Sequence, residues 1–186
     1  LNMVFEMSND SYSTGLYLSR YKLNLFGNFT YFQEDPLNGD AHEQVDRRWI
    51  YGGHFEFQRE LTSRINLRAG TDMRSDQIGE VSLHAVENRI RLGLVRQDSV
   101  DWLSLGVFSE LEIDISDKLR SFLGIRLDYS DYNVLANLSD NSGKGSDDIW
   151  LPSIGFAYEV GSFGELYLNW GKGFHSNDVR GATIAF

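Results

Sequence analysis

Residues 47–61 read RRWIYGGHFEFQREL, and apolar and polar side chains alternate along them one position at a time. The apolar parity holds Trp49, Tyr51, Phe55 and Phe57, and the opposite parity holds Arg48, His54, Glu56, Gln58 and Glu60. Successive side chains of a β-strand point to opposite faces, so the stretch predicts a strand with one apolar face and one wet face. Similar segments recur along the chain. A charged face repeated strand after strand favours a membrane β-barrel, with lipid outside and water inside.

The composition excludes several other classes of protein. No apolar run approaches the ~18 to 20 residues that a spanning helix needs. The chain has no cysteine, so it forms no disulfide and no Cys-ligated metal site. A formal net charge of −10 without a basic stripe argues against a nucleic-acid partner. The sequence opens on Leu1 inside an apparent strand, so we expect any export signal to have been removed or to lie upstream.

The alternation predicts about eight strands, joined by connections that alternate in length. The predicted strands are 1–8, 15–32, 47–61, 64–73, 100–115, 119–132, 149–160 and 165–172, and a weaker stretch at 86–95 is placed in a loop hairpin or a strand extension. Short connections rich in turn-forming residues lie at 9–14, 62–63, 116–118 and 161–164, and long ones lie at 33–46, 74–99, 133–148 and after Gly173. The predicted fold class is all-β: an antiparallel transmembrane β-barrel portion with short periplasmic turns and long extracellular loops.

The charged parity predicts the lumen wall of this barrel. Its members include His54, Glu110, Glu112, Arg120 and Arg126. Because the strands on either side of the turn at 116–118 carry opposite charges, we expect a cross-strand ladder that fixes their register. Structural pairing is the first interpretation of these charges, and guidance of a ligand is the alternative.

Aromatic rings and an acidic loop add two further expectations. The rings expected to form interface girdles, beside an apolar belt of about 25 Å, are Trp49, Tyr51, Tyr129, Tyr132, Trp150 and Trp170. The acidic residues of the first long loop are Glu34, Asp35, Asp40, Glu43 and Asp46. They would favour a cationic ligand or divalent ions that bridge lipid phosphates, and a simply solvated loop explains them as well.

Two stretches carry a resemblance to a known family. Residues 101–134 read DWLSLGVFSELEIDISDKLRSFLGIRLDYSDYNV, and residues 165–181 read ELYLNWGKGFHSNDVRG. With the Asn-Ser-Gly of 141–143 between them, they resemble the barrel of a TonB-dependent outer-membrane receptor. The likeness begins near GTDMRSD at 70–76, and GKGFHSNDVRG is its most specific part. The chain departs from the family pattern at 151–153, Leu-Pro-Ser where Pro-Lys is usual, and at Val179, where Ala is usual.

The resemblance implies a much larger protein. Receptors of this family close about 22 strands around a plug domain. At this chain's number of residues per strand, the 22 strands alone would need roughly 500 residues, before any plug. Residues 1–186 are therefore expected to be part of a single outer-membrane β-barrel domain, with the plug domain and the TonB box not present. The implied function is import of a scarce nutrient, such as a ferric siderophore or other metal chelate, into a Gram-negative bacterium.

The same resemblance implies the partners. They are the plug domain, the remaining barrel strands, TonB acting through the plug, the lipid bilayer with its lipopolysaccharide, and the small-molecule or metal-chelate ligand. We identify no catalytic residue, no cofactor and no metal site, so we expect part of a transporter and not an enzyme.

The loop GFHSNDVRG holds the candidate contact residues His175, Asn177, Asp178 and Arg180. Local loop architecture, with backbone hydrogen bonds and an Arg–carboxylate pair, is one interpretation, and contact with the plug or ligand is the other. The histidines predicted in loops are His42, His84 and His175. Capture of haem or metal by these histidines is a less favoured hypothesis.

Two other classes of protein stay open. A complete eight-stranded outer-membrane barrel would act as a structural anchor or a lipid-modifying enzyme, and the final aromatic residue, Phe186, is typical of such proteins. The terminal GATIAF is too short to span a membrane, and a Ser next to His175 is weak evidence for a hydrolase because neighbours on an extended chain point apart. A soluble β-sandwich or sugar-binding module would bury its aromatic rings between two sheets.

Overall fold

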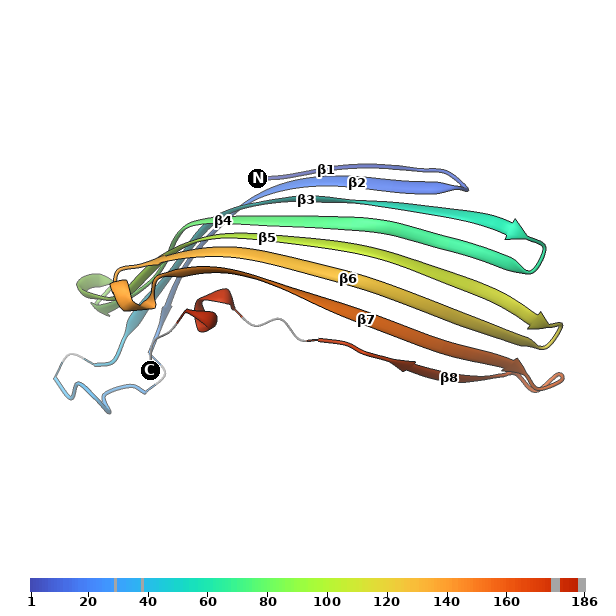
Figure 1. Ribbon diagram of the computed structural model, residues 1–186. Coiled ribbons are helices and arrows are strands. Elements are labelled where there is room, and N and C mark those ends of the chain that lie inside the picture. The colour runs from blue at the N-terminus through green and yellow to red at the C-terminus, as the bar shows by residue number, and fades with distance from the viewer. Residues whose placement is uncertain (29, 38, 175–177, 184–186) are drawn as a thin grey trace.

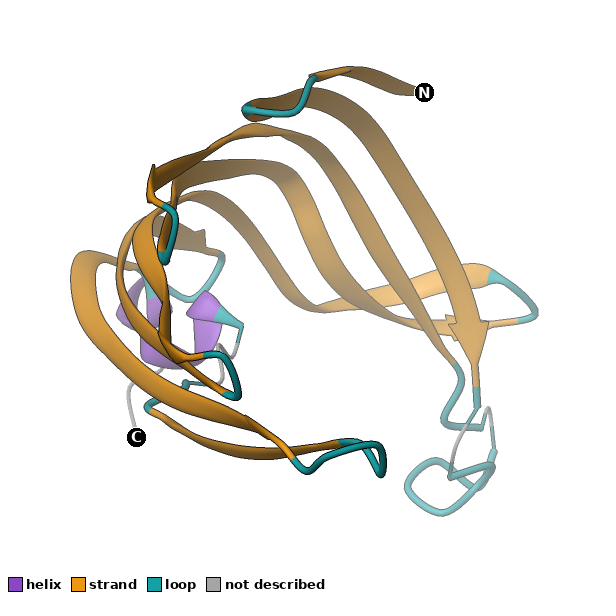
Figure 2. Cartoon of the chain, turned by 90° about the vertical axis from the view of Figure 1, so that its right-hand side faces the viewer, coloured by secondary structure: helices purple, strands orange, loops and turns teal. Residues whose placement is uncertain are grey.

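A computed structural model of the chain describes residues 1–28, 30–37, 39–174 and 178–183. The described strands form one 8-stranded antiparallel sheet in the order β1 to β8. They are β1 (Asn2–Ser8), β2 (Tyr12–Gly27), β3 (His42–Thr62), β4 (Ile65–Glu87), β5 (Ile90–Ser116), β6 (Leu119–Ala136), β7 (Gly143–Glu159) and β8 (Glu165–Gly171), with short 3₁₀ turns η1 (Ser139–Asn141) and η2 (Val179–Ala182). Each strand lies beside its neighbours in sequence (Figure 1), and the sheet curls into an open arc (Figure 2).

The arc has two free edges. Within the described residues, β1 pairs only with β2, and β8 pairs only with β7. A complete eight-stranded barrel would need β1 and β8 to pair, so this alternative is not what the sheet forms. The sheet does not form a β-sandwich either, because aromatic rings that a sandwich would bury are exposed: Trp150 is 56% exposed and Trp170 is 63% exposed. The described part of the chain holds no helix long and apolar enough to cross a membrane.

Several strands are longer than predicted. β4 and β5 meet at a turn through Asn88 and Arg89, whose φ angles of 49° and 66° suit a two-residue hairpin turn. The predicted long loop at 74–99 is therefore wrong, and the weak alternation at 86–95 is a strand extension. The register shift between Ile78 and Val81 marks a bulge in β4. Beyond the bulge the odd and even positions of β4 exchange faces, so the alternation of apolar and polar residues no longer reveals the strand in the sequence. β3 and β7 likewise begin inside predicted loops.

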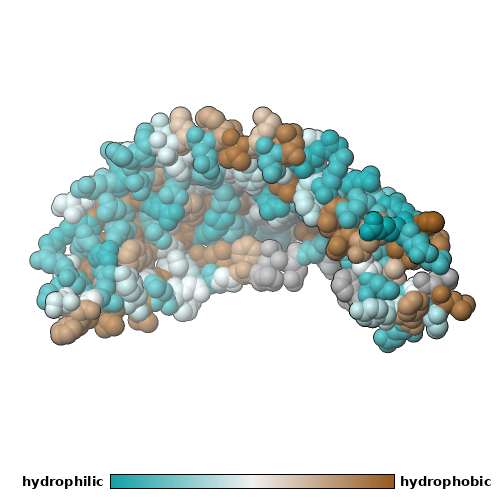
Figure 3. Space-filling view, turned by 180° about the vertical axis from the view of Figure 1, so that it is seen from behind, coloured by the Kyte–Doolittle hydropathy of each residue, from teal (hydrophilic) through white to brown (hydrophobic). Residues whose placement is uncertain are grey.

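The two faces of the sheet follow residue parity. Asp72 and Gly106 are paired on one face, and Met73 and Leu105 are paired on the other. The first face lines the hollow of the arc, where hydrophilic side chains predominate (Figure 3). We call it the concave face. The opposite, convex face presents exposed apolar side chains that include Leu103, Leu105, Val107, Leu123, Ile125, Ile154 and Leu168.

Aromatic rings border the apolar part of the convex face. The rings and their register partners on β5 are Tyr51 with Leu103, Tyr129 with Leu105, and Trp150 with Val107. From Tyr51 to Tyr129 and from Tyr129 to Trp150, the partner on β5 moves two residues toward the short-turn end. Such a shift is expected of rings at one membrane height when the strands are tilted by about 45°. Leu103 and Ile113 bound an apolar stretch that rises about 34 Å along β5, or about 24 Å after this tilt. Tyr132 is the exception among the predicted girdle rings, because its parity places it on the concave face opposite Trp102.

The connections define two ends of the sheet. The short-turn end holds the β1–β2, β3–β4, β5–β6 and β7–β8 turns, and the long-loop end holds the β2–β3, β4–β5 and β6–β7 connections and η2 (Figure 1).

Asp40 organises the described part of the β2–β3 connection. Its carboxylate accepts hydrogen bonds from the Thr30 hydroxyl at 2.7 Å and from the backbone N–H groups of Glu34 and Asp35 at 2.9 and 2.6 Å. These bonds, that of Glu34 first, hold the pKa of Asp40 below its usual value.

Candidate functional site

The concave face carries ion-paired groups in clusters, and the first lies across β4, β5 and β6. Asp72, Gly106 and Asp128 are direct register partners in one row. The guanidinium of Arg126 lies over Gly106 and donates to Asp72 at 2.8 Å and to Asp128 at 2.6 Å. A Cβ at Gly106 would stand 2.0 Å from Arg126 Nη2, so only glycine leaves room for this arginine. One cation is therefore fixed between two carboxylates on three strands.

A second cluster, nearer the long-loop end, has the opposite composition. The Asp76 carboxylate, 3% exposed, accepts from Arg48 Nη1 at 3.1 Å and from Arg74 Nε at 2.7 Å. Arg48 also bonds Asp46, and Arg74 lies over the Trp102 ring, 5.6 Å from its centroid. A nearly buried carboxylate needs such donors, because desolvation otherwise disfavours its charge.

Near the short-turn end, Arg120 joins β5, β6 and β8. Its guanidinium is 3.2 Å from Glu112 and is also paired with Glu165. Arg68 on β4 makes two bonds of 2.8 Å to Glu56 on β3 and lies over the Phe108 ring at 5.5 Å. Charge-assisted and bidentate bonds of this kind fix side-chain geometry as well as charge.

The chain after β8 returns to the concave face at the long-loop end. Arg180 Nη1 lies 3.6 Å from Asp98 Oδ2 on β5, and Arg96 Nε lies 2.7 Å from the same atom. Arg180 also binds Asp178 through several hydrogen bonds, which lower the pKa of that carboxyl. Within the described residues, Asp98 Oδ1 and Arg96 Nη2 are buried without a hydrogen-bond partner. Each member of this ion pair therefore keeps one buried atom without a partner among the described residues.

The sequence-predicted lumen residues share this face. Register and parity place His54, Glu110, Glu112, Arg120 and Arg126 on the concave side. Arg120 meets Glu112 across the predicted turn, whereas Arg126 meets Asp72 and Asp128 instead of the expected glutamates. The role of these residues in transport stays a prediction.

Two of the four candidate loop residues can be placed. Asp178 and Arg180 are paired with each other as the local-architecture interpretation requires. His175 and Asn177 lie outside the described residues.

Sequence reasoning missed the Asp76 and Asp98 clusters because it assigned 74–99 to a loop. The alternating pairs Arg74 with Asp76 and Arg96 with Asp98 were the pattern that would have found them. It also left the acidic residues of the predicted loop unassigned. The structure gives several of them intramolecular partners: Glu43 accepts from Asn24 and from Arg91, each at 2.6 Å.

The histidines do not gather into a metal site in the described part of the chain. No group of three or more His, Cys, Asp or Glu residues there is arranged to hold a metal ion. His84 is buried within β4, with its Nε2 3.1 Å from the Ser82 hydroxyl oxygen. It was predicted in a loop, and this placement is wrong.

An antiparallel sheet with a belted apolar convex face, a charged concave face, short turns at one end and the longer β2–β3 and β6–β7 connections at the other defines the class of protein. It is a wall segment of a transmembrane β-barrel, with periplasmic turns at the short-turn end and extracellular connections at the long-loop end.

Comparison with known families identifies that barrel. The family model described as TonB dependent receptor-like, beta-barrel matches residues 2–184, so the chain belongs to this family. A comparison with curated proteins gave no match. Among solved structures, the Copper transporter OprC is similar with a TM-score of 0.68 at 14% sequence identity, over 91% of this chain and 30% of that chain. At this identity the likeness shows the fold alone. The chain spans 30% of the OprC length.

Proposed function

We propose that this chain is part of the barrel wall of a receptor that imports a scarce nutrient, such as a ferric siderophore or another metal chelate, across the outer membrane of a Gram-negative bacterium. The observation that carries the proposal is the charged concave face of a barrel wall from the TonB-dependent receptor family. A wet, charged wall suits a lumen that holds a plug and passes a polar ligand. Metal as the cargo element is part of this proposal, and the structural neighbour of similar fold is named as a copper transporter.

The remaining partners follow from the same family. A separate plug domain would fill the lumen, further strands would close the barrel, and TonB would act through the plug. The concave clusters would face the plug, and the chain itself would provide a wall and loops but no chemistry.

The Arg180 region is the part of this chain that we propose contacts plug or ligand. Arg180 brings the segment after β8 onto Asp98, beside two buried polar atoms that lack a partner among the described residues. The side chains of Arg180 and Asp178 stay 28% and 56% exposed there, so a polar group of the plug or ligand would reach them. His175 and Asn177 belong to the same proposal through their position in the sequence.

Uptake by whole cells tests the proposal. Cells with the full-length receptor should accumulate radioactive iron supplied as ferric siderophore, or radioactive copper, under metal limitation. Deletion of either the receptor or TonB should remove the accumulation of the transported metal. Normal accumulation of both metals in both deletions would contradict the proposal.

A single variant tests the contact region. Arg180→Gln should weaken ligand binding to the intact receptor, while the heat-dependent shift in gel migration that marks a folded barrel stays unchanged. Glu165→Gln, which removes a partner of Arg120 near the short-turn end, is the matched control. Equal ligand binding by Arg180→Gln and the parent receptor would refute a role for this residue.

A further inference from the structure

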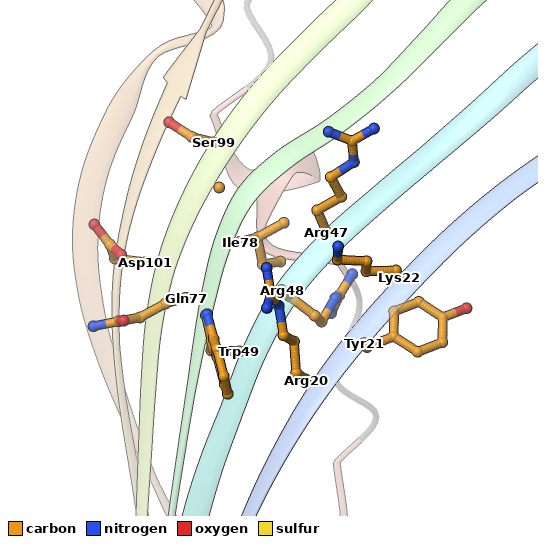
Figure 4. Close-up of a pocket in the computed structure, with 11 residues that line it drawn as sticks. Arg20, Tyr21, Lys22, Arg47, Arg48, Trp49, Gln77, Ile78, Ser99 and Asp101 are labelled. Atoms are coloured by element: carbon orange, nitrogen blue, oxygen red, sulfur yellow. The ribbon is translucent and has the colours of Figure 1, made fainter. Parts of the chain in front are cut away.

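Three cations gather on the convex face of β2 and β3, toward the long-loop end. The antiparallel register sets Lys22 directly opposite Arg47, and Arg20 directly opposite Trp49. The Arg20 guanidinium carbon stands 5.1 Å from the centroid of the Trp49 ring. Figure 4 shows Arg20 beside Trp49, and Lys22 next to Arg47 further along the two strands. We call these three residues the basic cluster.

The charge of the basic cluster is poorly compensated within the described residues. Arg47 has Glu80 at 3.4 Å, but neither Arg20 nor Lys22 forms an ion pair with a described residue. All three side chains belong to exposed residues. Like charges directly opposite each other destabilise a strand pair, so Lys22 and Arg47 would be stabilised by an anion between them.

The concave face of the sheet makes the difference clear. Arginines there are matched with carboxylates, as in the clusters of Arg48, Arg74 and Arg126. The basic cluster thus differs from these concave-face arginines, which are paired with carboxylates.

The basic cluster also borders a hollow in the surface. A cleft of about 570 Å³ is lined by all three cations, by Trp49 and Gln77, and by one carboxylate, Asp101, which forms no ion pair with the cluster. The bulge at Gly79, where the pairing of β3 and β4 shifts register beside Arg47, lies at its edge. Bulges bend a sheet locally, which accounts for a concavity on an otherwise convex surface.

The height of the basic cluster matches the headgroup layer of a bilayer. Trp49 and Arg47 are the next two outward positions beyond Tyr51, which borders the apolar belt. Neighbouring residues on the same face are about 7 Å apart along a strand, which corresponds to about 5 Å along the membrane normal for a strand tilted by about 45°. The cluster therefore lies roughly 5 to 10 Å beyond the hydrocarbon boundary, where the polar layer of a bilayer is about 5 to 8 Å thick.

We propose that the basic cluster binds the phosphate groups of a phosphorylated glycolipid in the outer leaflet. Arg and Lys are the side chains that bind phosphate, and the stacked Trp49 ring suits the boundary between sugar and acyl chain. The acyl chains would descend over the exposed apolar side chains below, such as Leu16 and Phe55. The proposal rests on the proposed outer-membrane location but not on any import activity.

Lipid retention by the full-length receptor tests the proposal. The receptor is purified from outer membranes in detergent, and the glycolipid that stays bound is measured by mass spectrometry. Replacing Arg20 and Lys22 together by Gln should weaken retention about 30-fold, given about a fivefold effect for each cation near an anionic surface. Arg59→Gln is the matched control, because Arg59 is exposed on the same face of β3 at the short-turn end.

The lipid source is resolved by reconstitution. The receptor is mixed with vesicles that contain bisphosphorylated lipid A, dephosphorylated lipid A or phosphatidylglycerol as the minor component. Enrichment of bisphosphorylated lipid A alone, lost in the double variant and kept in Lys22→Arg, is the expected result. Equal retention of all three lipids, or equal retention by the folded double variant and the parent, would overturn the proposal. Metal uptake is measured separately, so either proposal can fail alone.

Discussion

The two faces of β4, β5 and β6 are stabilised in different ways, although they share one backbone. On the concave face, Arg126 reaches two carboxylates only because Gly106 supplies no side chain between them. On the convex face, Leu105 and Val107 stay 40% and 50% exposed and have no described partner face to pack against. The concave face is therefore stabilised by specific ion pairs and by the absence of side chains at glycine, whereas the convex face needs only apolar surroundings.

The largest expected effect comes from filling a space that the concave face keeps open. A Cβ at Gly52 would stand 2.2 Å from the Met73 carbonyl oxygen and 2.6 Å from the Tyr17 hydroxyl oxygen. Gly52→Val should therefore disrupt the β3–β4 pairing and cost more than about 3 kcal/mol, because backbone cannot move aside cheaply. The yield of heat-modifiable barrel on a gel measures this. Gly93→Val, at a glycine with nothing within 4 Å, should fold normally, and a similar loss there would refute the steric explanation.

The second largest effect is expected from a charged side chain on the convex face. Leu123→Arg would place a cation on the apolar part of the convex face, with an expected cost of about 2 to 4 kcal/mol in urea unfolding from lipid vesicles. Asn66→Arg places the same side chain on the concave face, level with Glu60 and Glu112, and should cost little. Equal costs for the two variants would mean that the faces do not differ in their surroundings.

The cluster around Arg126 gives a smaller effect. Arg126→Met leaves Asp72 and Asp128 facing each other without a cation and should destabilise the barrel by about 1 to 2 kcal/mol, a value reduced because Arg126 and Asp72 are partly exposed to solvent. Changing both aspartates to Asn in the same variant should recover most of the loss. If the triple variant is less stable than Arg126→Met in urea unfolding, the two carboxylates do not repel each other as described.

The smallest effect concerns the β2–β3 connection. The pKa of Asp40 is lowered in the folded protein, so its ionised carboxylate contributes stability that is present above the usual pKa of 3.8 and is lost as the pH falls through the lowered value. Amide exchange at Glu34 and Asp35 should therefore accelerate below about pH 4 relative to strand amides. Asp40→Asn should exchange faster at neutral pH and show no such acid transition. An unchanged acid transition in this variant would assign it to another group.

Strand existence and order were predictable from sequence, because alternation is visible wherever parity is unbroken. The stretch from Leu103 to Ile113 shows this best, with every outward position but Ser109 apolar and no bulge in its pairing. The bulge at Gly79 removed that information for the upper part of β4, and a second register shift, between Leu83 and His84, removed it for the start of β5, because a one-residue insertion reverses which parity faces the lumen.

The concave clusters were predictable only in part. Arg120 and Glu112 lie on strands joined by a tight turn, so local register predicts their contact. Arg126 spans from β6 over β5 to β4, and Arg180 returns from beyond β8 to β5. Such pairs depend on sheet curvature and on gaps at glycine, neither of which a pattern of alternation contains.

Cysteine scanning along β5 tests the difference between the faces most directly, since the chain contains no cysteine of its own. Single cysteines at Ser104, Glu110 and Glu112, and at Leu105, Val107 and Leu111, are introduced into the full-length receptor in outer membranes and treated with a water-soluble maleimide. We expect labelling at the first three positions and protection at the second three. Labelling without alternation, or protection of the first set with labelling of the second, would contradict a water-lined concave face and a lipid-covered convex face.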